Sequence, residues 1–237
     1  MSDIKKAVLL IGSPKLKNST SESLGGYLLE RIGEYDILTE TLHLHSEIKT
    51  EAKKNLFLEK IEEADIIILA APLYIDTLPA KVIKALTLIA DNRKKLKLKD
   101  AEALKEQFFV AVVNCGFPEV EHNKIALKVY EQFALETGIK YLGGIAVGMG
   151  VAVNGKPLKE IGGMVKNLVK GLDQAAEEIV NKKQLSDSVI EKTSKPLMPK
   201  KWLYTLVGDL SWRFQAFKNG VYRKIKDKPY KKVKNHG

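Results

Sequence analysis

The sequence predicts an α/β fold, a doubly wound sheet of five parallel strands, followed by a basic helical extension. Five apolar runs alternate with stretches of helical periodicity along residues 1–185. The runs at 7–11, 65–71 and 108–113 are continuous, which is typical of strands buried on both faces of a parallel sheet. From residue 186 the pattern changes to polar residues and prolines. We therefore expect one domain over 1–185 and an aromatic-containing, basic extension over 186–237.

The individual elements follow one another in strict alternation. The expected strands are 7–11, 35–44, 65–71, 108–113 and 141–153, and the expected helices are 21–33, 52–63, 79–95, 119–137 and 158–182. Each helical stretch has apolar residues at helical spacing, such as Leu24, Leu28 and Ile32 in the first. Pro79 suits the first turn of the third helix, and Gly138 suits the end of the fourth.

Composition excludes several classes of protein. The apolar fraction of 45% is ample for a packed core and argues against a disordered chain. A single cysteine, Cys115, excludes a disulfide framework and a cysteine-ligated cluster or zinc site within one chain, and we predict no metal site. No apolar run approaches the roughly 18 residues that span a bilayer, and the N-terminus does not resemble a signal peptide. We therefore expect a cytoplasmic protein.

The positive charge is concentrated in the C-terminal region. The whole chain carries a net charge of +10, and residues 191–237 alone contain thirteen Lys and Arg against three acidic residues. The remaining 190 residues are therefore neutral overall. A negatively charged partner is therefore expected to bind at the tail and not at the main domain.

Three loops should meet at the carboxyl edge of the sheet, where open parallel sheets bind ligands. The first loop follows strand 7–11 and carries five hydroxyl residues between Ser13 and Ser23. Backbone amides at the start of the next helix attract an anion, and hydroxyls add hydrogen-bond donors. This pattern favours a phosphate site, although Ser and Thr are also common helix caps. The loop matches neither the Walker A motif nor the dinucleotide fingerprint G-x-G-x-x-G.

The other two loops contain residues that could bind a planar ring or let the backbone lie close to a ligand. The second, 71–79, exposes Tyr74 and apolar residues between prolines, which suits a planar ring or simply covers the end of the sheet. The third, 114–119, contains Gly116, which allows close approach of the backbone to a ligand. Cys115 in this loop is interpreted as a buried residue and not as a nucleophile.

Taken together, the loops resemble those of the flavodoxin-like NAD(P)H-dependent FMN reductases, including the cluster-free relatives of the iron–sulfur flavoproteins. The residues Gly12-Ser13-Pro14-Lys15 and Ser19-Thr20-Ser21 are similar to the family's phosphate loop, with lysine in place of the usual arginine. Pro72-Leu73-Tyr74 is similar to its Pro-x-Tyr motif, and Gly116 stands where the family has a glycine beside the flavin ring. The resemblance covers about residues 5–182 and implies a flavodoxin-like sheet of order 2-1-3-4-5.

The resemblance also implies a function. FMN would accept hydride from NADPH or NADH and pass electrons to a small-molecule acceptor: a quinone, an azo or nitro compound, a metal ion or free flavin. The cofactor performs this chemistry, so we name no catalytic residue. The predicted cofactor-binding residues are Ser13, Lys15, Asn18, Ser19, Thr20, Ser21, Pro72, Leu73, Tyr74, Ile75, Asn114, Cys115, Gly116 and Phe117. A homodimer is expected. The alternatives are a non-enzymatic FMN electron carrier and a flavin-free module that acts through its basic tail.

The tail combines an aromatic stripe with a basic end. Trp202, Leu206, Leu210 and Phe214 fall four residues apart, and a basic segment runs from Lys218 to Lys234. Three hypotheses follow. The stripe packs on its own domain or on a partner subunit, which we favour because exposed apolar stripes usually mark protein contacts. Alternatively, the tail binds an anionic membrane surface or a nucleic acid.

Overall fold

The computed structural model describes residues 4–15, 17–100, 104–198 and 200–228. The chain divides into two compact units, Met1–Leu197 and Met198–Gly237. Leu16 of the first loop and residues 229–237, which include the end of the basic segment, lie outside the described residues.

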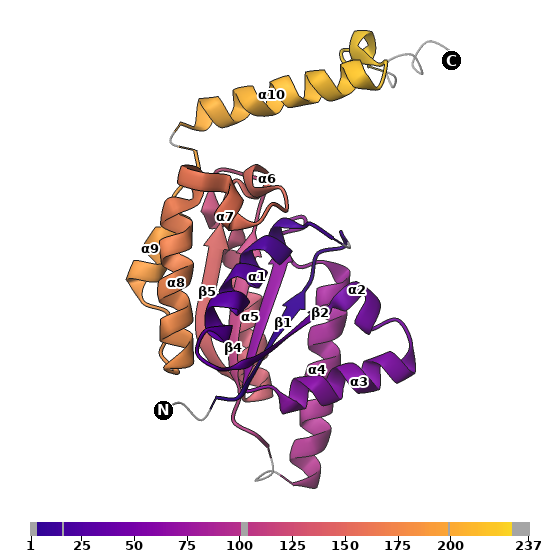
Figure 1. Ribbon diagram of the computed structural model, residues 1–237. Coiled ribbons are helices and arrows are strands. Elements are labelled where there is room, and N and C mark those ends of the chain that lie inside the picture. Colours follow the sequence, from indigo (N-terminus) through magenta and orange to yellow (C-terminus); the bar gives the residue numbers. More distant parts are fainter. Residues whose placement is uncertain (1–3, 16, 101–103, 199, 229–237) are drawn as a thin grey trace, which may run out of the picture. The chain divides into compact units, whose positions relative to one another are not determined.

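The first unit is built on a five-stranded parallel sheet (Figure 1). Its strand order is β2-β1-β3-β4-β5, and every neighbouring pair is parallel. The strands are β1 (Lys6–Ile11), β2 (Leu38–His43), β3 (Ile66–Pro72), β4 (Phe108–Asn114) and β5 (Lys140–Val147). The predicted flavodoxin-like fold and its order 2-1-3-4-5 are confirmed.

The sequence pattern of the strands explains which of them are central. β4 is buried along its whole length, and β3 is buried except at Pro72. β2 lies at the edge of the sheet, and of its six residues Leu42 is the one that is buried. β2 pairs with one edge of β1, and the chain then crosses over so that β3 pairs with the other edge of β1. The carboxyl ends of β1 and β3 are therefore the point at which the winding reverses, where ligands bind in such sheets.

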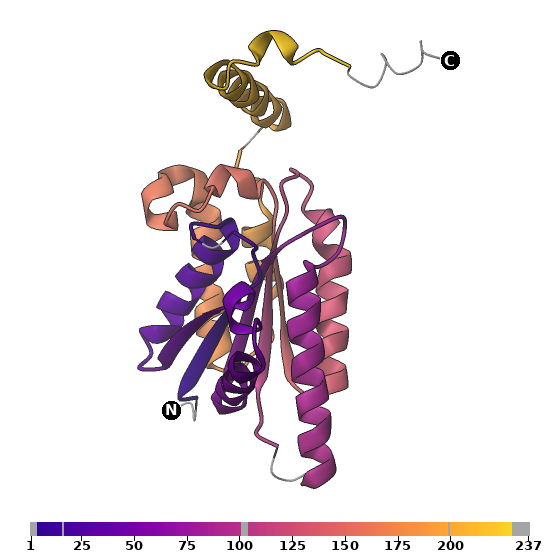
Figure 2. The ribbon, with the colours of Figure 1, turned by 90° about the vertical axis from the view of Figure 1, so that its right-hand side faces the viewer.

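Helices cover both faces of the sheet (Figure 2). One face carries α1 (Thr20–Gly33), α8 (Lys166–Val180) and α9 (Asp187–Ser194). On this face α8 contacts both α1 and α9. The other face carries α3 (Glu51–Glu63), α4 (Ala80–Lys99) and α5 (Lys124–Thr137). Short elements are α2 (Leu44–Glu47), η1 (Val120–Asn123), α6 (Gly150–Val153), α7 (Leu158–Ile161) and η2 (Gly162–Val165), while α10 (Lys201–Lys218) and η3 (Tyr222–Lys224) belong to the second unit.

A glycine lets α1 lie close to the sheet. A Cβ atom at Gly25 would lie 2.7 Å from Leu9 Cδ1 and 2.8 Å from Ala70 Cβ, closer than carbon atoms can pack. α1 therefore rests directly on β1 and β3, and its N-terminus is held at the carboxyl ends of these strands. This contact positions the first loop of the candidate site.

The amino edge of the sheet is held by a buried carboxylate. Asp65 Oδ2 accepts hydrogen bonds from the backbone amides of Lys5 and Lys6 at 2.7 and 2.8 Å, and Oδ1 lies 2.7 Å from Lys105 Nζ. Burial by itself raises the pKa of Asp65, but the hydrogen bonds from Lys105 and from the two amides outweigh it, so the pKa lies below its usual value. This cluster joins β1 to β3 at the end opposite the candidate site.

Three sequence predictions differ from the structure. The fifth strand ends at Val147 and not at residue 153, because Met149 adopts a φ of 56° and the chain turns into α6. The helix predicted over 158–182 is interrupted at Gly162, whose φ of 75° ends α7, so the regular helix α8 begins only at Lys166. The separate C-terminal unit begins at Met198 and not at residue 186, because α9 packs on α8 and β5.

Candidate active site

A cavity of about 320 Å³ lies at the carboxyl edge of the sheet. Four loops line it, those that follow β1, β3, β4 and β5. Its volume lies in the range of small-molecule sites in proteins. The lining residues are Ser13, Lys15, Ser19, Thr20, Ser21, Pro72, Leu73, Tyr74, Asn114, Cys115, Gly116, Gly150, Val151 and Asn154.

Side-chain hydrogen bonds connect the first loop to the other loops. The Ser21 hydroxyl donates to Asn114 Oδ1 at 2.8 Å, and both side chains are buried. The Thr20 hydroxyl donates to the backbone oxygen of Gly150, also at 2.8 Å. These two bonds join the start of α1 to the ends of β4 and β5. The two hydroxyls therefore support the walls of the cavity and do not donate into it.

Backbone hydrogen bonds connect the remaining loops. The Leu73 amide donates to the Asn114 oxygen at 2.8 Å, which joins the loops after β3 and β4. The Gly150 amide donates to the Cys115 oxygen at 2.8 Å, which joins the loops after β4 and β5. A Cβ atom at Gly150 would lie 3.1 Å from that oxygen and 3.0 Å from Asn114 Nδ2, so the close approach requires glycine or a local shift. The cavity is consequently formed by loops that hold one another in place.

The N-terminus of α1 offers two amides to the cavity. Ser19 caps the helix: its hydroxyl accepts from the Glu22 amide at 3.1 Å, and the Glu22 carboxylate accepts from the Ser19 amide at 3.4 Å. The amides of Thr20 and Ser21, the first two helical residues, have no carbonyl partner within the helix. The capping interpretation therefore holds for Ser19 and Glu22, and it leaves the Thr20 and Ser21 amides without a partner in the helix.

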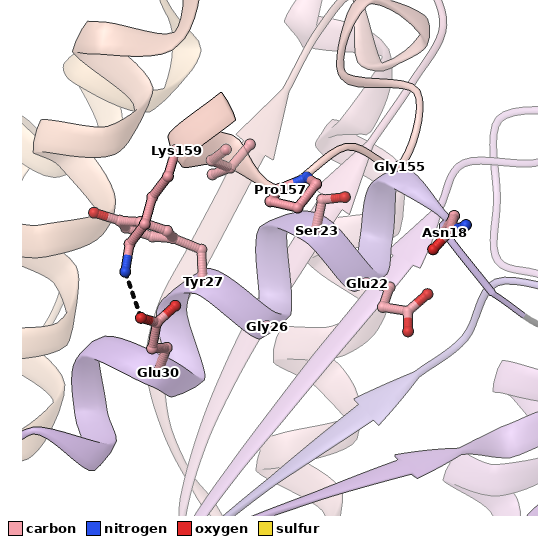
Figure 3. Close-up of a pocket in the computed structure, with 10 residues that line it drawn as sticks. Asn18, Glu22, Ser23, Gly26, Tyr27, Glu30, Gly155, Pro157 and Lys159 are labelled. Atoms are coloured by element: carbon pink, nitrogen blue, oxygen red, sulfur yellow. Dashed lines mark hydrogen bonds and ion pairs between the residues drawn. The ribbon is translucent and has the colours of Figure 1, made fainter. Parts of the chain in front are cut away.

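Charge distinguishes this cavity from a second one of similar size. Among the described residues that line the first, Lys15 is the one charged side chain, and its Nζ donates to the Asn18 oxygen at 2.7 Å. The second cavity, of about 290 Å³, lies beside α1 and is lined by Glu22 and Glu30 (Figure 3). Lys159 neutralises Glu30 there through an ion pair. An anionic ligand therefore favours the first cavity.

Eleven of the predicted site residues line the first cavity, and three do not. Asn18 lines the second cavity. Ile75 lies at the tip of a tight turn, where it is 98% exposed, because Tyr74 and Thr77 exchange both backbone hydrogen bonds. Phe117 is exposed and packs against the His122 ring, with 4.9 Å between ring centroids.

The residues that the sequence prediction missed are Gly150, Val151 and Asn154, which follow β5. Gly150 and Val151 fall within the strand expected over 141–153, and Asn154 follows it directly. The glycines at 148 and 150 were the available signal, because a glycine pair directly after an apolar run indicates that the strand has ended.

Cys115 is a buried thiol and not a poised nucleophile. Its side chain lies behind the third loop, with Sγ 3.5 Å from the Phe117 oxygen and 3.5 Å from Asn123 Nδ2. Burial raises the pKa of the Cys115 thiol, although a hydrogen bond with the Phe117 backbone and one from the Asn123 side-chain amide partly oppose the shift. The thiol therefore stays protonated at neutral pH, as its interpretation as a buried residue requires.

Comparison with known proteins supports the assignment of the first loops. The family model described as NADPH-dependent FMN reductase matches residues 5–116 of this chain. This segment contains the first and second loops and the start of the third, so the family resemblance predicted from these motifs is confirmed over it. The match also supports FMN as cofactor and NAD(P)H as co-substrate. No curated protein sequence matches the chain.

Solved structures share the fold at low sequence identity. The apo form of an NADH:FMN oxidoreductase is 17% identical, with a TM-score of 0.56 over 84% of this chain and 98% of its own. An FMN-dependent NADH-azoreductase from Bacillus anthracis, in complex with FMN, is 16% identical, with a TM-score of 0.54 over 75% and 100%. A flavodoxin from Streptococcus pneumoniae is 16% identical, with a TM-score of 0.50 over 75% and 99%. At this identity the similarity establishes the fold alone.

Proposed function

We propose that this chain, an NADPH-dependent FMN reductase-like oxidoreductase by the family match over residues 5–116, binds FMN in the cavity at the carboxyl edge of β1, β3, β4 and β5. The observation that carries the proposal is the agreement between this cavity and the loops that the family resemblance singles out. The cavity lies beside the reversal of winding, it has one cationic side chain in its described lining, and it opens at the N-terminus of α1.

The phosphate of FMN fits the end of the cavity formed by the first loop. The amides of Thr20 and Ser21 are free of helical partners, and Lys15 supplies a positive charge. The Ser13 hydroxyl accepts from the Lys15 amide at 3.2 Å, and the Ser19 hydroxyl accepts from the Glu22 amide, so each keeps its own proton to donate. These donors suit a phosphate better than a neutral ligand.

The ring of FMN fits between the second and third loops. Pro72, Leu73 and Tyr74 form one wall, and Gly116 and Val151 contribute to another. A Cβ atom at Gly116 would lie 3.6 Å from Val151 Cγ2, so a larger side chain there would occupy space between two lining residues. The residues of this chain therefore bind the ring, orient it and exclude water from one side of it.

The titratable side chains in the described lining of this cavity are Lys15, Tyr74 and Cys115. No His, Asp or Glu side chain lines it, and the Cys115 thiol is held protonated by burial. FMN, when bound, supplies the redox chemistry by accepting hydride from a reduced nicotinamide and passing electrons to an acceptor. The protein's part is to bind and position the two reactants.

The acceptor is proposed to be a small molecule: a quinone, an azo or nitro compound, a metal ion or free flavin. We also propose a homodimer, which light scattering on the purified protein would measure directly. Both proposals follow from the family resemblance and not from a particular contact in the fold.

A visible absorption spectrum and a turnover assay test the proposal. The purified protein is expected to be yellow, or to become so when incubated with FMN, and to oxidise NADPH or NADH faster when one of these acceptors is added. A protein that stays colourless and does not quench FMN fluorescence would refute flavin binding. Tight FMN binding with essentially no NADPH or NADH oxidation would instead identify a non-enzymatic electron carrier.

A further inference from the structure

The C-terminal helix α10 leaves an apolar surface uncovered within its own unit. Every side chain of α10 that the structure describes is exposed or only partly buried. Both tryptophans of the chain lie in this helix, Trp202 with 61% and Trp212 with 74% of its surface exposed. By contrast, α8, which is of similar length, buries seven residues. Large exposed aromatic side chains in such density indicate a surface that binds a partner.

The apolar residues of α10 share one side of the helix. At 3.6 residues per turn, seven of them fall within an arc of about 140°. We call this set the apolar arc: Trp202, Leu203, Leu206, Val207, Leu210, Phe214 and Phe217. Arg213 is the charged residue inside the arc, and its guanidinium is paired with Asp209 at 2.9 Å, which neutralises it. Trp212, Ser211 and Gln215 lie on other sides of the helix.

Strong positive charge accompanies the arc. Residues 198–237 contain eleven Lys and Arg and two Asp, a net charge of +9. Lys218 ends the helix, and Arg223, Lys224, Lys226 and Lys228 follow within ten residues. An apolar helical face followed directly by a cluster of basic residues is the pattern of helices that lie in the interface of anionic membranes.

Charge decides between the possible partners. A second copy of the helix would bury the arc, but it would bring together two tails that each carry +9. A nucleic acid would neutralise the lysines, but it would leave the seven apolar side chains in water. A bilayer with anionic lipids accommodates both features, because apolar side chains enter the acyl boundary while lysines remain at the headgroups. In the described part of the chain, no helix is long and apolar enough to cross a membrane, so this helix would lie on the surface.

We propose that α10 and the basic segment after it bind the surface of membranes that contain anionic phospholipids. The apolar arc inserts at the level of the headgroups, and the basic residues bind the lipid phosphates. This proposal does not depend on flavin binding, because α10 belongs to a unit distinct from the one that contains the cavity. The sequence pattern alone favoured packing on the chain's own domain or on a partner subunit; the positive charge that accompanies the arc is our reason for proposing a membrane surface.

Vesicle binding by the full-length protein tests the proposal. The probes are vesicles of phosphatidylcholine with 30 mol% phosphatidylserine and vesicles of phosphatidylcholine alone. Because both tryptophans lie in α10, intrinsic tryptophan fluorescence reports on this helix specifically. Anionic vesicles are expected to shift its emission to shorter wavelength and to bind the protein at least tenfold more tightly than neutral vesicles. Raising the salt concentration should weaken the binding.

Two double variants separate the effect of disrupting the apolar arc from the effect of adding negative charge to the helix. Leu210→Glu with Phe214→Glu places two carboxylates in the middle of the arc, and Ser211→Glu with Gln215→Glu places two at the same spacing on another side of the exposed helix. The first pair is expected to reduce vesicle affinity at least tenfold, and the second pair to retain most of it. Circular dichroism and flavin content should be the same in both.

Several results would overturn the proposal. Equal affinity for neutral and anionic vesicles, no binding to either, or equal loss in both double variants would each do so. A change from dimer to monomer in the first variant, without vesicle binding by the wild type, would identify a second copy as the partner. Binding of an oligonucleotide in place of vesicles would identify a nucleic acid.

Discussion

Lys15 provides the sharpest test of the proposed phosphate site. It is the charged side chain in the described lining of the cavity, and its Nζ is held by the Asn18 oxygen at 2.7 Å. Lys17, two residues further along the same loop, is also exposed but does not line the cavity. We expect Lys15→Gln to weaken FMN binding, and Lys17→Gln to leave it nearly unchanged.

The expected magnitude follows from Coulomb's law with screening. Two unit charges 4 Å apart attract by about 4 kcal/mol near a protein surface and by about 1 kcal/mol in water. Lys15 is exposed, so solvent screening brings its contribution toward the lower figure. A loss of about 1–2 kcal/mol corresponds to roughly a 5- to 30-fold increase in the dissociation constant of FMN. The structural role of the side chain is small, so the fold should be retained.

Fluorescence titration of FMN at two salt concentrations measures this effect. Lys15→Arg should retain most of the affinity, because it keeps the positive charge. The difference between wild type and Lys15→Gln should shrink as salt is raised, because ions screen exposed charges. The same titration with riboflavin, which lacks the phosphate, should show no difference between the two proteins. Equal FMN dissociation constants for wild type and Lys15→Gln at low salt would mean that the phosphate binds elsewhere.

Three further predictions follow from other contacts. Ser21→Ala removes the buried hydrogen bond to Asn114 and should lower the free energy of unfolding by about 1–2 kcal/mol in urea titrations; no change would mean that the loops are joined in another way. Cys115, whose thiol pKa is raised by burial, should react with a thiol reagent at pH 8 at least tenfold more slowly in the folded protein than in urea, and equal rates would contradict its burial. The pKa of Asp65 is lower in the folded state than in the unfolded chain, where it is about 4. The stabilisation of the folded state by the Asp65 carboxylate is therefore fully present above the unfolded-state pKa and is lost as the pH falls through the folded-state pKa. Asp65→Asn should therefore destabilise the protein by about 2 kcal/mol at pH 7 and by much less below pH 3, as followed by urea unfolding, and a constant difference across this range would exclude the role of its charge.

Local sequence was sufficient to predict most of the elements and the edge of the sheet at which the candidate cavity lies. Continuous apolar runs predicted β1, β3 and β4 to within a residue or two, because strands buried on both faces have no polar positions. The three loops after these strands were expected to meet, since parallel strands bring their carboxyl ends to one edge. This is why eleven of the predicted site residues line one cavity.

Local sequence did not reveal how the loops hold one another. Ser21 and Asn114 are separated by 93 residues, and their hydrogen bond depends on how α1 rests on the sheet through Gly25. The hydroxyls of Thr20 and Ser21 were expected to bind the ligand, yet both are used to support neighbouring loops. Such bonds arise from the register and packing of distant elements, and nothing in the spacing of the residues encodes them.

The order of elements, the parallel sheet and the basic tail were thus determined by the sequence itself, because hydrophobic periodicity and charge are local properties. The tertiary structure decided that the loop after β5 completes the cavity with Gly150 and Val151. It also decided which amides of α1 remain free, because the capping of Ser19 by Glu22 occupies the others. The physical reason is that a hydrogen-bonding group can be assigned to a ligand only after its partners within the folded chain are known.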